Sequence, residues 1–436
     1  MSQEPMLLEI SETLFLKEKR DMTEFFVIAP IMCNYVLWVL KDAVLNGKKR
    51  LYFLARDGYS MYQVANEFCI RLNLPIECCY LYCSRYALRS AEYCLLYEKS
   101  LEYICLGGMN VTFAKIMDRA GLSESEAKLV GELTGYADKM TAVLSHKEVK
   151  TLAPILKNCS VFMDAMVSHS RDKYPNVSGY LRQEGMLNDV PYALVDSGWV
   201  GSMQKSFLHI LRSMGYQGKL EGYYFGMYEY PKNVDRDSYH VWYFRPENML
   251  RRKVYFNNNL FECIFSSPEG MTVGFEWGTY GYTPVLEKDI NPNCEKVEKS
   301  TAYLIKYAEM LAERLNKQEE NAVWSKNDFL PTATKLLKNF MGKPTRLEAS
   351  NYGDYVFCDD VIGETTQKLA TNLTYKEIKA NRLINKFINI YLKKGKSVRE
   401  SAWPEASVML VDKAGRRELV HCALYKYVLY LRKKMK

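Results

Sequence analysis

The 436-residue chain has few of the residues on which zinc and histidine chemistry depend. It has only five histidines, and none of them stands in an H-E-x-x-H pattern. Of its twelve cysteines, Cys78, Cys79 and Cys83 lie close together, but no second pair or histidine cluster follows at zinc spacing. These absences argue against zinc sites and histidine-led catalysis, and they predict reduced thiols in the core.

Long hydrophobic runs are also missing. No basic start leads into an apolar segment, so we expect no secretory signal and predict a cytoplasmic protein. The uncharged run from Phe25 to Leu40 is shorter than the roughly 20 residues of a membrane span. It also contains Pro30 and Asn34, so it predicts buried core. A composition with 48% hydrophobic and 25% charged residues is ordinary for globular proteins, and the length requires more than one core.

What the sequence does contain is two strand–loop–helix units. In the first, the apolar run Leu51–Ala55 is typical of a buried parallel strand, and a helical pattern over Met61–Leu72 follows it. In the second, Pro191–Val195 leads into a polar, glycine-containing turn and then into a helix over Met203–Met214. This alternation predicts an α/β fold with a Rossmann-like, or phosphoribosyltransferase-like, parallel sheet.

Helical patterns dominate elsewhere, and they set the expected domain boundaries. We predict an α/β ligand-binding domain over 20–290 with a helical insertion at about 90–175, and a mainly helical C-terminal region over 295–436. The aromatic stretch Ser238–Gly274 is expected to be rich in loops. A helix-turn-helix over Thr112–Leu133 is disfavoured, because its second helix would carry three glutamates that repel phosphates. We therefore expect no nucleic-acid partner.

The two polar turns carry the candidate chemistry, because ligands of open α/β sheets bind beyond the carboxyl ends of the strands. In the first turn, Arg56 supplies a charged donor and Asp57 a carboxylate. In the second, Asp196 offers hydrogen-bond acceptors for sugar hydroxyls or a metal ion. Glycines and helix N-terminal N–H groups beyond it suit a phosphate, and the residues concerned are Gly198, Gly201, Ser202, Met203 and Gln204. Purely structural turns remain the alternative at both places.

Several of these segments resemble the sequence blocks of one protein family. Phe53–Gly58, Ser84–Arg85 and Val195–Gln204 are similar to blocks of a bacterial polysaccharide-locus family. Glu262–Val273 and Pro344–Asp360 resemble further blocks. Members of this family are often fused to, or encoded beside, a haloacid-dehalogenase-type phosphatase. Their sugar-transferring module resembles a phosphoribosyltransferase that puts ribofuranose 5-phosphate onto a glycan, after which the phosphatase removes the phosphate.

The resemblance implies a phosphoribosyl diphosphate donor, and an acceptor glycan such as capsule or O-antigen that is built on a lipid carrier. A separate phosphatase partner is implied, because the chain has no phosphatase nucleophile motif of its own. Arg56, Asp57 and Gly58 match the family's diphosphate-binding loop, which often contains a cis peptide. Asp196 to Gln204 match the loop that holds the ribose hydroxyls and the 5-phosphate. This loop departs from the usual pattern, because Ser197 replaces the second acidic residue and Trp199 intrudes.

The expected site follows from these matches. Asp57 and Asp196 are the candidate catalytic residues and Mg²⁺ ligands, and the sequence does not decide which of them acts as the general base. Glu262 and Glu269 are candidate walls of the site. The expected donor-binding residues are Arg56, Gly58, Ser84, Arg85, Ser197, Gly198, Trp199, Gly201, Ser202, Met203 and Gln204.

Some alternatives stay open at this point. Phe357–Thr366 has an acidic pattern closer to that of other phosphoribosyltransferases, but no apolar helix follows it in register. Asp235-Arg236-Asp237 looks like a metal-binding D-x-D motif, although we expect a surface turn there. A nucleotide-sugar-dependent glycosyltransferase and a non-catalytic scaffold are the rival functions. The basic, tyrosine-rich stretch Ala423–Lys436 predicts either peripheral contact with the inner membrane face or a helix packed on the protein.

Overall fold

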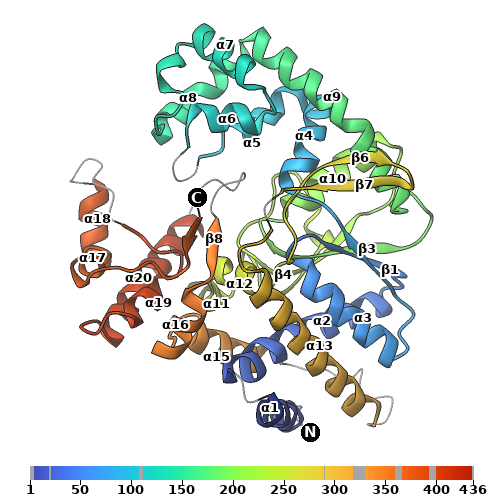
Figure 1. Cartoon of the computed structure of the whole chain (residues 1–436), viewed down its shortest axis with the longest axis vertical. Helices are drawn as coiled ribbons and strands as arrows, with labels where there is room; N and C mark the ends of the chain where they lie inside the picture. Colours follow the sequence, from blue (N-terminus) through green and yellow to red (C-terminus); the bar gives the residue numbers. More distant parts are fainter. Residues whose placement is uncertain are drawn as a thin grey trace.

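A five-stranded parallel sheet forms the centre of the protein (Figure 1). The computed structural model describes residues 4–18, 21–107, 111–288, 290–317, 329–358, 366–391 and 399–434. The strand order is β2-β1-β3-β4-β5, and every neighbouring pair is parallel. The strands are β1 (Arg50–Leu54), β2 (Glu77–Leu81), β3 (Tyr192–Trp199), β4 (Glu221–Met227) and β5 (Tyr239–Phe244). This architecture confirms the predicted α/β fold.

Helices cover both faces of the sheet, as a buried parallel sheet requires. One face packs on α2 (Ala29–Leu45), α3 (Gly58–Arg71) and α13 (Cys294–Asn316). The other packs on α4 (Arg85–Leu96), α9 (Ser160–Gln183) and α10 (Ser202–Ser213). Strand side chains alternate between the two layers: Phe53 joins the first hydrophobic cluster, whereas Tyr52 and Leu54 join the second.

A helical lobe stands above the sheet in Figure 1 and has a hydrophobic core of its own. Its short helices are α5 (Leu101–Ile104), α6 (Phe113–Arg119), α7 (Glu124–Thr134) and α8 (His146–Lys157), with two 3₁₀ turns, η2 (Tyr97–Ser100) and η3 (Ala137–Lys139). The long helices α4 and α9 extend from the lobe to the sheet. The lobe lies where the helical insertion at about 90–175 was predicted.

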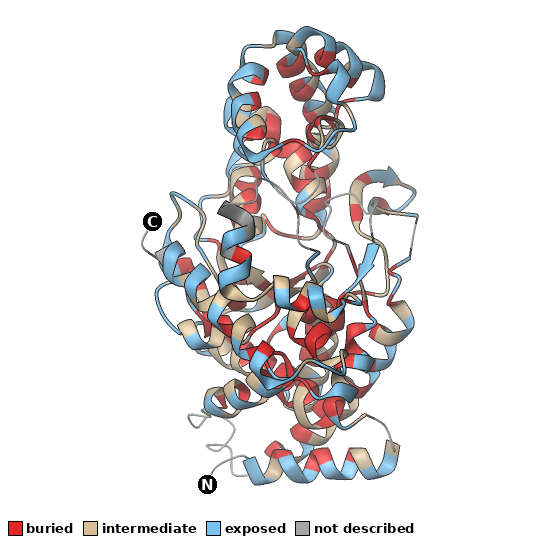
Figure 2. Cartoon of the chain, turned by 90° about the vertical axis from the view of Figure 1, so that its left-hand side faces the viewer, coloured by how far each residue is buried: buried red, intermediate tan, exposed pale blue. Residues whose placement is uncertain are grey.

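The N-terminal helices belong to the core of the sheet. They are α1 (Glu4–Glu18), a π-helical turn η1 (Glu24–Ile28) and α2. Residues 24–45 form a helix long and apolar enough to cross a membrane by length and composition, but 67% of its apolar window is buried inside the fold. The buried side chains of α2 pack on the strands and on α13, as the interpretation of Phe25–Leu40 as core requires. Figure 2 shows that buried residues gather inside the body of the molecule and exposed residues on its outside.

The boundary expected near residue 295 does not separate two cores. Helix α13 begins there and packs between α1, α2 and α3, so that Leu304, Tyr307 and Leu311 share one hydrophobic cluster with the sheet. The same cluster extends to Trp403 in the C-terminal region. The predicted C-terminal region is mainly helical, but its first helix is part of the α/β layer.

The remaining elements surround this frame. After β4 come a 3₁₀ turn η4 (Arg236–Ser238), α11 (Leu250–Val254), α12 (Asn258–Ile264) and an antiparallel hairpin of β6 (Thr272–Gly278) and β7 (Gly281–Leu286). The C-terminal region contains α15 (Leu330–Phe340), α16 (Arg346–Gly353), β8 (Val356–Cys358), β9 (Thr366–Lys368), α17 (Tyr375–Ala380), α18 (Leu383–Tyr391), α19 (Pro404–Met409) and α20 (Arg416–Lys434).

Two of the alternative motifs lie in these segments. Asp235 is exposed and pairs with Lys219 at 3.0 Å in a surface turn, as predicted. The acidic residues of Phe357–Thr366 lie outside the described residues.

Candidate carboxylate site

The candidate site lies at the carboxyl ends of β1 and β3. These adjacent strands lead into helices on opposite faces of the sheet, α3 and α10, so the site occupies the topological switch point of the fold. Crevices at such points are where open α/β sheets bind ligands. Asp57 occupies the position before α3, without a side-chain capping hydrogen bond, and Asp196 lies in the last half of β3. The fold therefore brings the two predicted turns together.

The strand β3 is longer than the sequence predicted. It does not break at Asp196 but continues to Trp199, and it pairs with β4 through Gly198–Gly226 and Trp199–Met227. The expected polar loop is therefore only Val200 and Gly201. The predicted loop is therefore shorter than expected, while the backbone N–H groups at the start of α10 stay available for an anion.

Three partly buried carboxyl groups form the core of the site: Asp57, Asp196 and Glu262 of α12. Burial and, second, repulsion from Asp57 together raise the pKa of Asp196 to about 7, although the backbone N–H groups of Ser197 and Gly198 favour the charged form. Burial and the same repulsion raise the pKa of Glu262 to about 8. Burial also raises the pKa of Asp57, although the Ser197 hydroxyl donates a short hydrogen bond to its Oδ2. The cluster is poised to gain or lose protons near neutral pH.

Two exposed arginines border this cluster. Arg56 follows β1 and Arg85 is the first residue of α4. The charge of Arg85 favours ionisation of all three carboxyl groups, which places it near the middle of the cluster, whereas Arg56 acts on Asp57. The peptide bond between Ala55 and Arg56 is cis. The fold therefore brings Arg56 and Arg85 to the same end of the sheet as the three carboxyl groups.

Trp199 fixes the position of Glu262. Its indole N–H donates to Glu262 Oε1 at 2.6 Å, and this hydrogen bond favours the charged carboxylate. Trp199 has a φ of +65°, a left-handed conformation that bulky residues rarely adopt. The ring packs against Tyr228, Phe256 and other aromatic side chains, which hold it in place. The intruding tryptophan is therefore a structural part of the site.

The glycines of the second unit are required by packing and backbone conformation. Gly198 has a φ of +109°, and a Cβ there would come within 2.5 Å of the Gly226 carbonyl oxygen. Gly201 has a φ of +62°, and a Cβ there would meet the Tyr239 ring at 2.6 Å. These contacts explain both glycines without a phosphate, so their presence in the sequence is not evidence for one.

Two predicted donor-binding side chains are engaged within the fold. The Gln204 amide donates to the Leu220 carbonyl oxygen and to Ser238 Oγ, both at 2.9 Å, and its oxygen accepts from Tyr224. Ser84 caps α4 and donates to the Thr272 carbonyl oxygen at 2.6 Å. The side chains of Ser84 and Gln204 therefore hold the scaffold, whereas the prediction for Gln204 concerned its backbone N–H, which these contacts leave in place. The start of α10, with Ser202 and Met203, has no side-chain cap, which leaves backbone N–H groups for an anion.

Mg²⁺ fits the site only if protein carboxylates and substrate phosphates coordinate it together. Within the described ranges, no group of three histidine, cysteine, aspartate or glutamate side chains is close enough to hold a metal ion. Asp57 and Asp196 are nevertheless near enough to repel each other. Mg²⁺ usually takes one or two carboxylates and completes its shell with substrate phosphates and water. The two aspartates suit that mode of binding.

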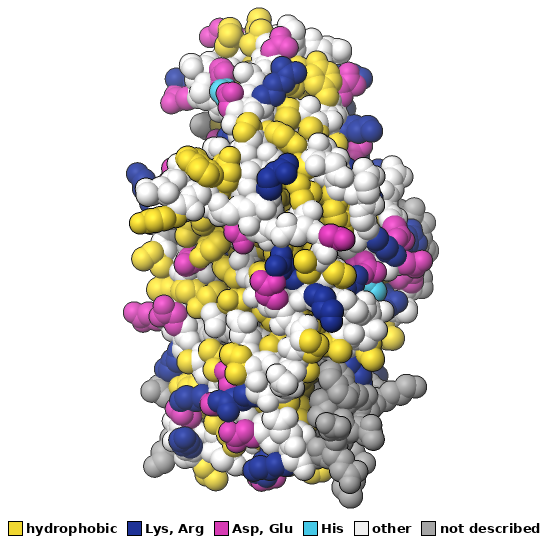
Figure 3. Space-filling view, turned by 90° about the vertical axis from the view of Figure 1, so that its right-hand side faces the viewer, with side chains coloured by type: hydrophobic (Ala, Val, Ile, Leu, Met, Phe, Trp, Pro, Cys, Tyr) yellow, Lys and Arg dark blue, Asp and Glu magenta, His cyan; other side chains and the backbone are white. Residues whose placement is uncertain are grey.

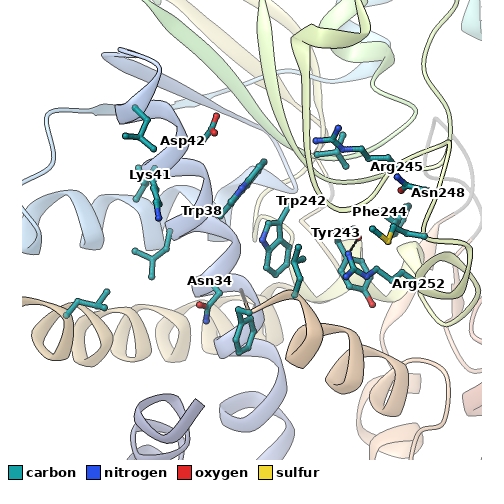
Figure 4. Close-up of a pocket in the computed structure, with 18 of the residues that line it drawn as sticks. Asn34, Trp38, Lys41, Asp42, Trp242, Tyr243, Phe244, Arg245, Asn248 and Arg252 are labelled. Atoms are coloured by element: carbon teal, nitrogen blue, oxygen red, sulfur yellow. Dashed lines mark hydrogen bonds between the residues drawn. The ribbon is translucent and has the colours of Figure 1, made fainter. Parts of the chain in front are cut away.

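A separate cavity of about 670 Å³ lies between α2, β5 and the start of α15 (Figure 4). In Figure 4, the rings of Trp38 and Trp242 lie next to each other, and Arg245, Asn248 and Arg252 gather on the side of β5 and α11. None of its lining residues belongs to the carboxylate cluster. Its chemistry is therefore distinct from that of the switch point.

The sequence did not single out the tyrosines beside the cluster. Tyr59, Tyr80 and Tyr82 lie at the carboxyl end of β2, next to Glu269. The spacing of Tyr80 and Tyr82 was the available signal, because alternate residues of a strand share one face.

Comparison of the chain with protein-family models and with curated proteins finds no match. The argument for function therefore depends on the site itself.

Proposed function

We propose that the protein is a glycosyltransferase of the phosphoribosyltransferase type. It transfers ribofuranose 5-phosphate from phosphoribosyl diphosphate to a bacterial surface-glycan acceptor and releases diphosphate. The observation that carries this proposal is the group of Asp57, Asp196 and Glu262 bordered by Arg56 and Arg85 at the switch point. Carboxylates accept hydrogen bonds from ribose hydroxyls, and guanidinium groups bind diphosphate through charge-assisted hydrogen bonds.

In this reaction an acceptor hydroxyl oxygen attacks C1 of the donor ribose. The bond between C1 and the diphosphate oxygen breaks, its electron pair leaves with the diphosphate, and the hydroxyl proton passes to a carboxylate. Asp196 is the better candidate for this general base, because its pKa of about 7 matches neutral conditions. Asp57 instead accepts a hydrogen bond from Ser197. Direct displacement would convert the α-configured donor into a β-riboside.

The remaining polar groups have supporting roles. Arg56 and Arg85 would stabilise the negative charge that develops on the leaving diphosphate. Mg²⁺ held by Asp57, Asp196 and the donor phosphates would supply further charge neutralisation. Trp199 would keep Glu262 facing the cluster. Together these residues distribute two tasks, proton acceptance and leaving-group stabilisation, between partly buried acids and exposed arginines.

The cellular setting that we propose is the cytoplasmic side of the inner membrane. The acceptor would be lipid-linked, and a separate haloacid-dehalogenase-type phosphatase would remove the 5-phosphate afterwards. In α20, Tyr430 stacks on Tyr228 and Lys426 pairs with Glu405 at 2.7 Å, so these two side chains pack on the protein instead of facing lipid. The exposed side of α20 is apolar at helical spacing, through Val420, Leu424, Val428 and Leu431. This stripe, followed by a basic end, supports peripheral membrane contact.

Diphosphate release tests the proposal directly. Purified protein is incubated with Mg²⁺, an acceptor glycan and either phosphoribosyl diphosphate or a panel of nucleotide sugars. We expect release only with phosphoribosyl diphosphate, and a loss of about a hundredfold or more in Asp196→Asn, because general-base catalysis contributes roughly 10²–10⁴ in rate. Release of a nucleoside phosphate, which is the leaving group of a nucleotide sugar, without release of diphosphate from phosphoribosyl diphosphate would establish the rival enzyme. No turnover of any donor would favour a scaffold.

A further inference from the structure

The tyrosines beside the carboxylate cluster form a compact aromatic surface. Tyr80 lies in β2, Tyr82 directly follows it, and Tyr59 lies in the first turn of α3. The ring centroids of Tyr59 and Tyr80 are 5.7 Å apart, and those of Tyr80 and Tyr82 are 5.1 Å apart, both in edge-to-face geometry. Tyr59 and Tyr82 remain partly exposed. The surface therefore presents ring area to solvent from a rigid base.

A carboxylate is fixed at the edge of this surface. Tyr82 donates its hydroxyl to Glu269 Oε1 at 3.3 Å. The backbone N–H of Glu269 donates to Ser267 Oγ at 3.1 Å, and Ser267 is fully buried. In the described part of the chain, no lysine, arginine or histidine forms an ion pair with Glu269. Glu269 therefore keeps acceptor capacity for a ligand.

The aromatic surface and the carboxylate cluster share one edge of the sheet. Strands β1 and β2 are neighbours in register from Arg50–Glu77 to Leu54–Leu81, so the segments after them leave the sheet side by side. The chain from Glu262 to Thr272 then connects both places, because Glu262 contacts Trp199 while Glu269 contacts Tyr82. Neighbouring strands are about 5 Å apart. A ligand on the tyrosines would thus lie at the same end of the sheet as Asp57.

The chemistry of the two places differs. The cluster has arginines and partly buried acids, which suit a charged donor, whereas the tyrosine surface has partly exposed rings and one carboxylate without a cation. A neutral sugar has an apolar C–H face that packs on an aromatic ring, and hydroxyl groups that donate to a carboxylate. We propose that Tyr59, Tyr82 and Glu269 form the subsite for a neutral sugar residue of the acceptor glycan.

This inference rests on the proposed function, and it specifies where the second substrate binds. The hairpin β6–β7 offers a matched control, because its turn carries a solvent-exposed Tyr280, 99% accessible, away from these contacts. Figure 3 views the face of the molecule that carries this hairpin, and hydrophobic side chains are exposed over its upper half. An exposed tyrosine alone therefore does not mark a sugar site, and the carboxylate of Glu269 beside Tyr82 distinguishes this one.

The test measures the kinetic constants of the two substrates separately. We expect Tyr59→Ala and Glu269→Gln to raise the KM for the acceptor glycan about tenfold or more, and to leave the KM for phosphoribosyl diphosphate unchanged. Tyr82→Phe keeps the ring and should have a smaller effect. Tyr280→Ala should match wild type in both constants. A change in donor KM with an unchanged acceptor KM would overturn the assignment.

A second readout needs no turnover. Saturation-transfer NMR of neutral oligosaccharide fragments with the full-length protein, without donor, should show contacts that Glu269→Gln and Tyr59→Ala reduce. Absence of any contact with wild-type protein would refute the subsite. If no donor releases diphosphate but these contacts are present, the proposed transfer is wrong while the sugar-binding surface stands. If a nucleoside alone binds these tyrosines and sugars do not, they hold a base instead, and the proposal fails.

Discussion

Replacement of Asp196 by asparagine should make the protein more stable relative to wild type as the pH rises. Burial raises the pKa of the Asp196 carboxyl from 3.8 to about 7, with repulsion from Asp57 as the second cause. The folded protein therefore favours the protonated acid. Its contribution to stability is complete below the unfolded pKa, near pH 4, and is lost as the pH rises through about 7. Asparagine has no proton to lose.

The size of the effect follows from the two pKa values. The difference between folded and unfolded chains corresponds to about 4 kcal/mol, and about 3 kcal/mol of this is lost between about pH 4 and pH 7. The unfolding free energy of Asp196→Asn, relative to wild type, should therefore increase by about 3 kcal/mol over that range. The substitution also removes a charge that repels Glu262, so the pKa of Glu262 should fall below about 8.

Urea unfolding at several pH values, followed by tryptophan fluorescence, measures this difference. Asp189→Asn is a suitable control, because Asp189 is an exposed carboxylate that lies just before β3 in the chain. The control should follow wild type at every pH. A difference between Asp196→Asn and wild type that stays constant from pH 4 to pH 7 would refute the reasoning, as would a relative loss of stability with rising pH.

Three further outcomes are expected. Arg56→Ala should weaken donor binding about tenfold in calorimetry, because charge-assisted hydrogen bonds contribute roughly 1.5–3 kcal/mol, and unchanged affinity would make this arginine structural. Trp199→Phe removes the N–H that favours charged Glu262, so the pKa of Glu262 should rise by about one from its value near 8. The pH–rate profile would show this rise, and an unshifted profile would exclude that coupling. Leu424→Ser with Val428→Ser should reduce pelleting with anionic liposomes at low salt and leave transfer to short soluble acceptors intact, whereas equal pelleting would exclude the apolar stripe of α20 as a membrane contact.

The parallel sheet could be predicted because two of its strands are short apolar runs followed by helical patterns. Leu51–Ala55 and Pro191–Val195 are of this kind, and both lie in the sheet. The strand β5 was missed, since Tyr239–Phe244 lies in an aromatic stretch that predicted loops. The end of β3 was misplaced for a related reason. Its polar, glycine-containing sequence is typical of a turn, but Gly198 is needed there because the strand packs closely against β4.

The site was predicted in part. Asp57 and Asp196 each follow a predicted strand, so sheet geometry was enough to bring them together. Glu262 was expected as a candidate wall of the site because of the resemblance, but its contact with Trp199 depends on how α12 packs, which no local pattern encodes. Gln204 and Ser84 look like ligand-binding residues in the sequence. The same polar residue types also form hydrogen bonds with buried backbone groups, and these two side chains do so.

The helical lobe is inserted between β2 and β3, within a connection that passes from one side of β1 to the other. Its short helices have a hydrophobic core of their own, whereas the carboxylates and arginines of the site come from segments outside that core. The lobe can therefore diverge in sequence, grow or be exchanged without disturbing the sheet or its charged groups. In evolutionary terms it is a replaceable module.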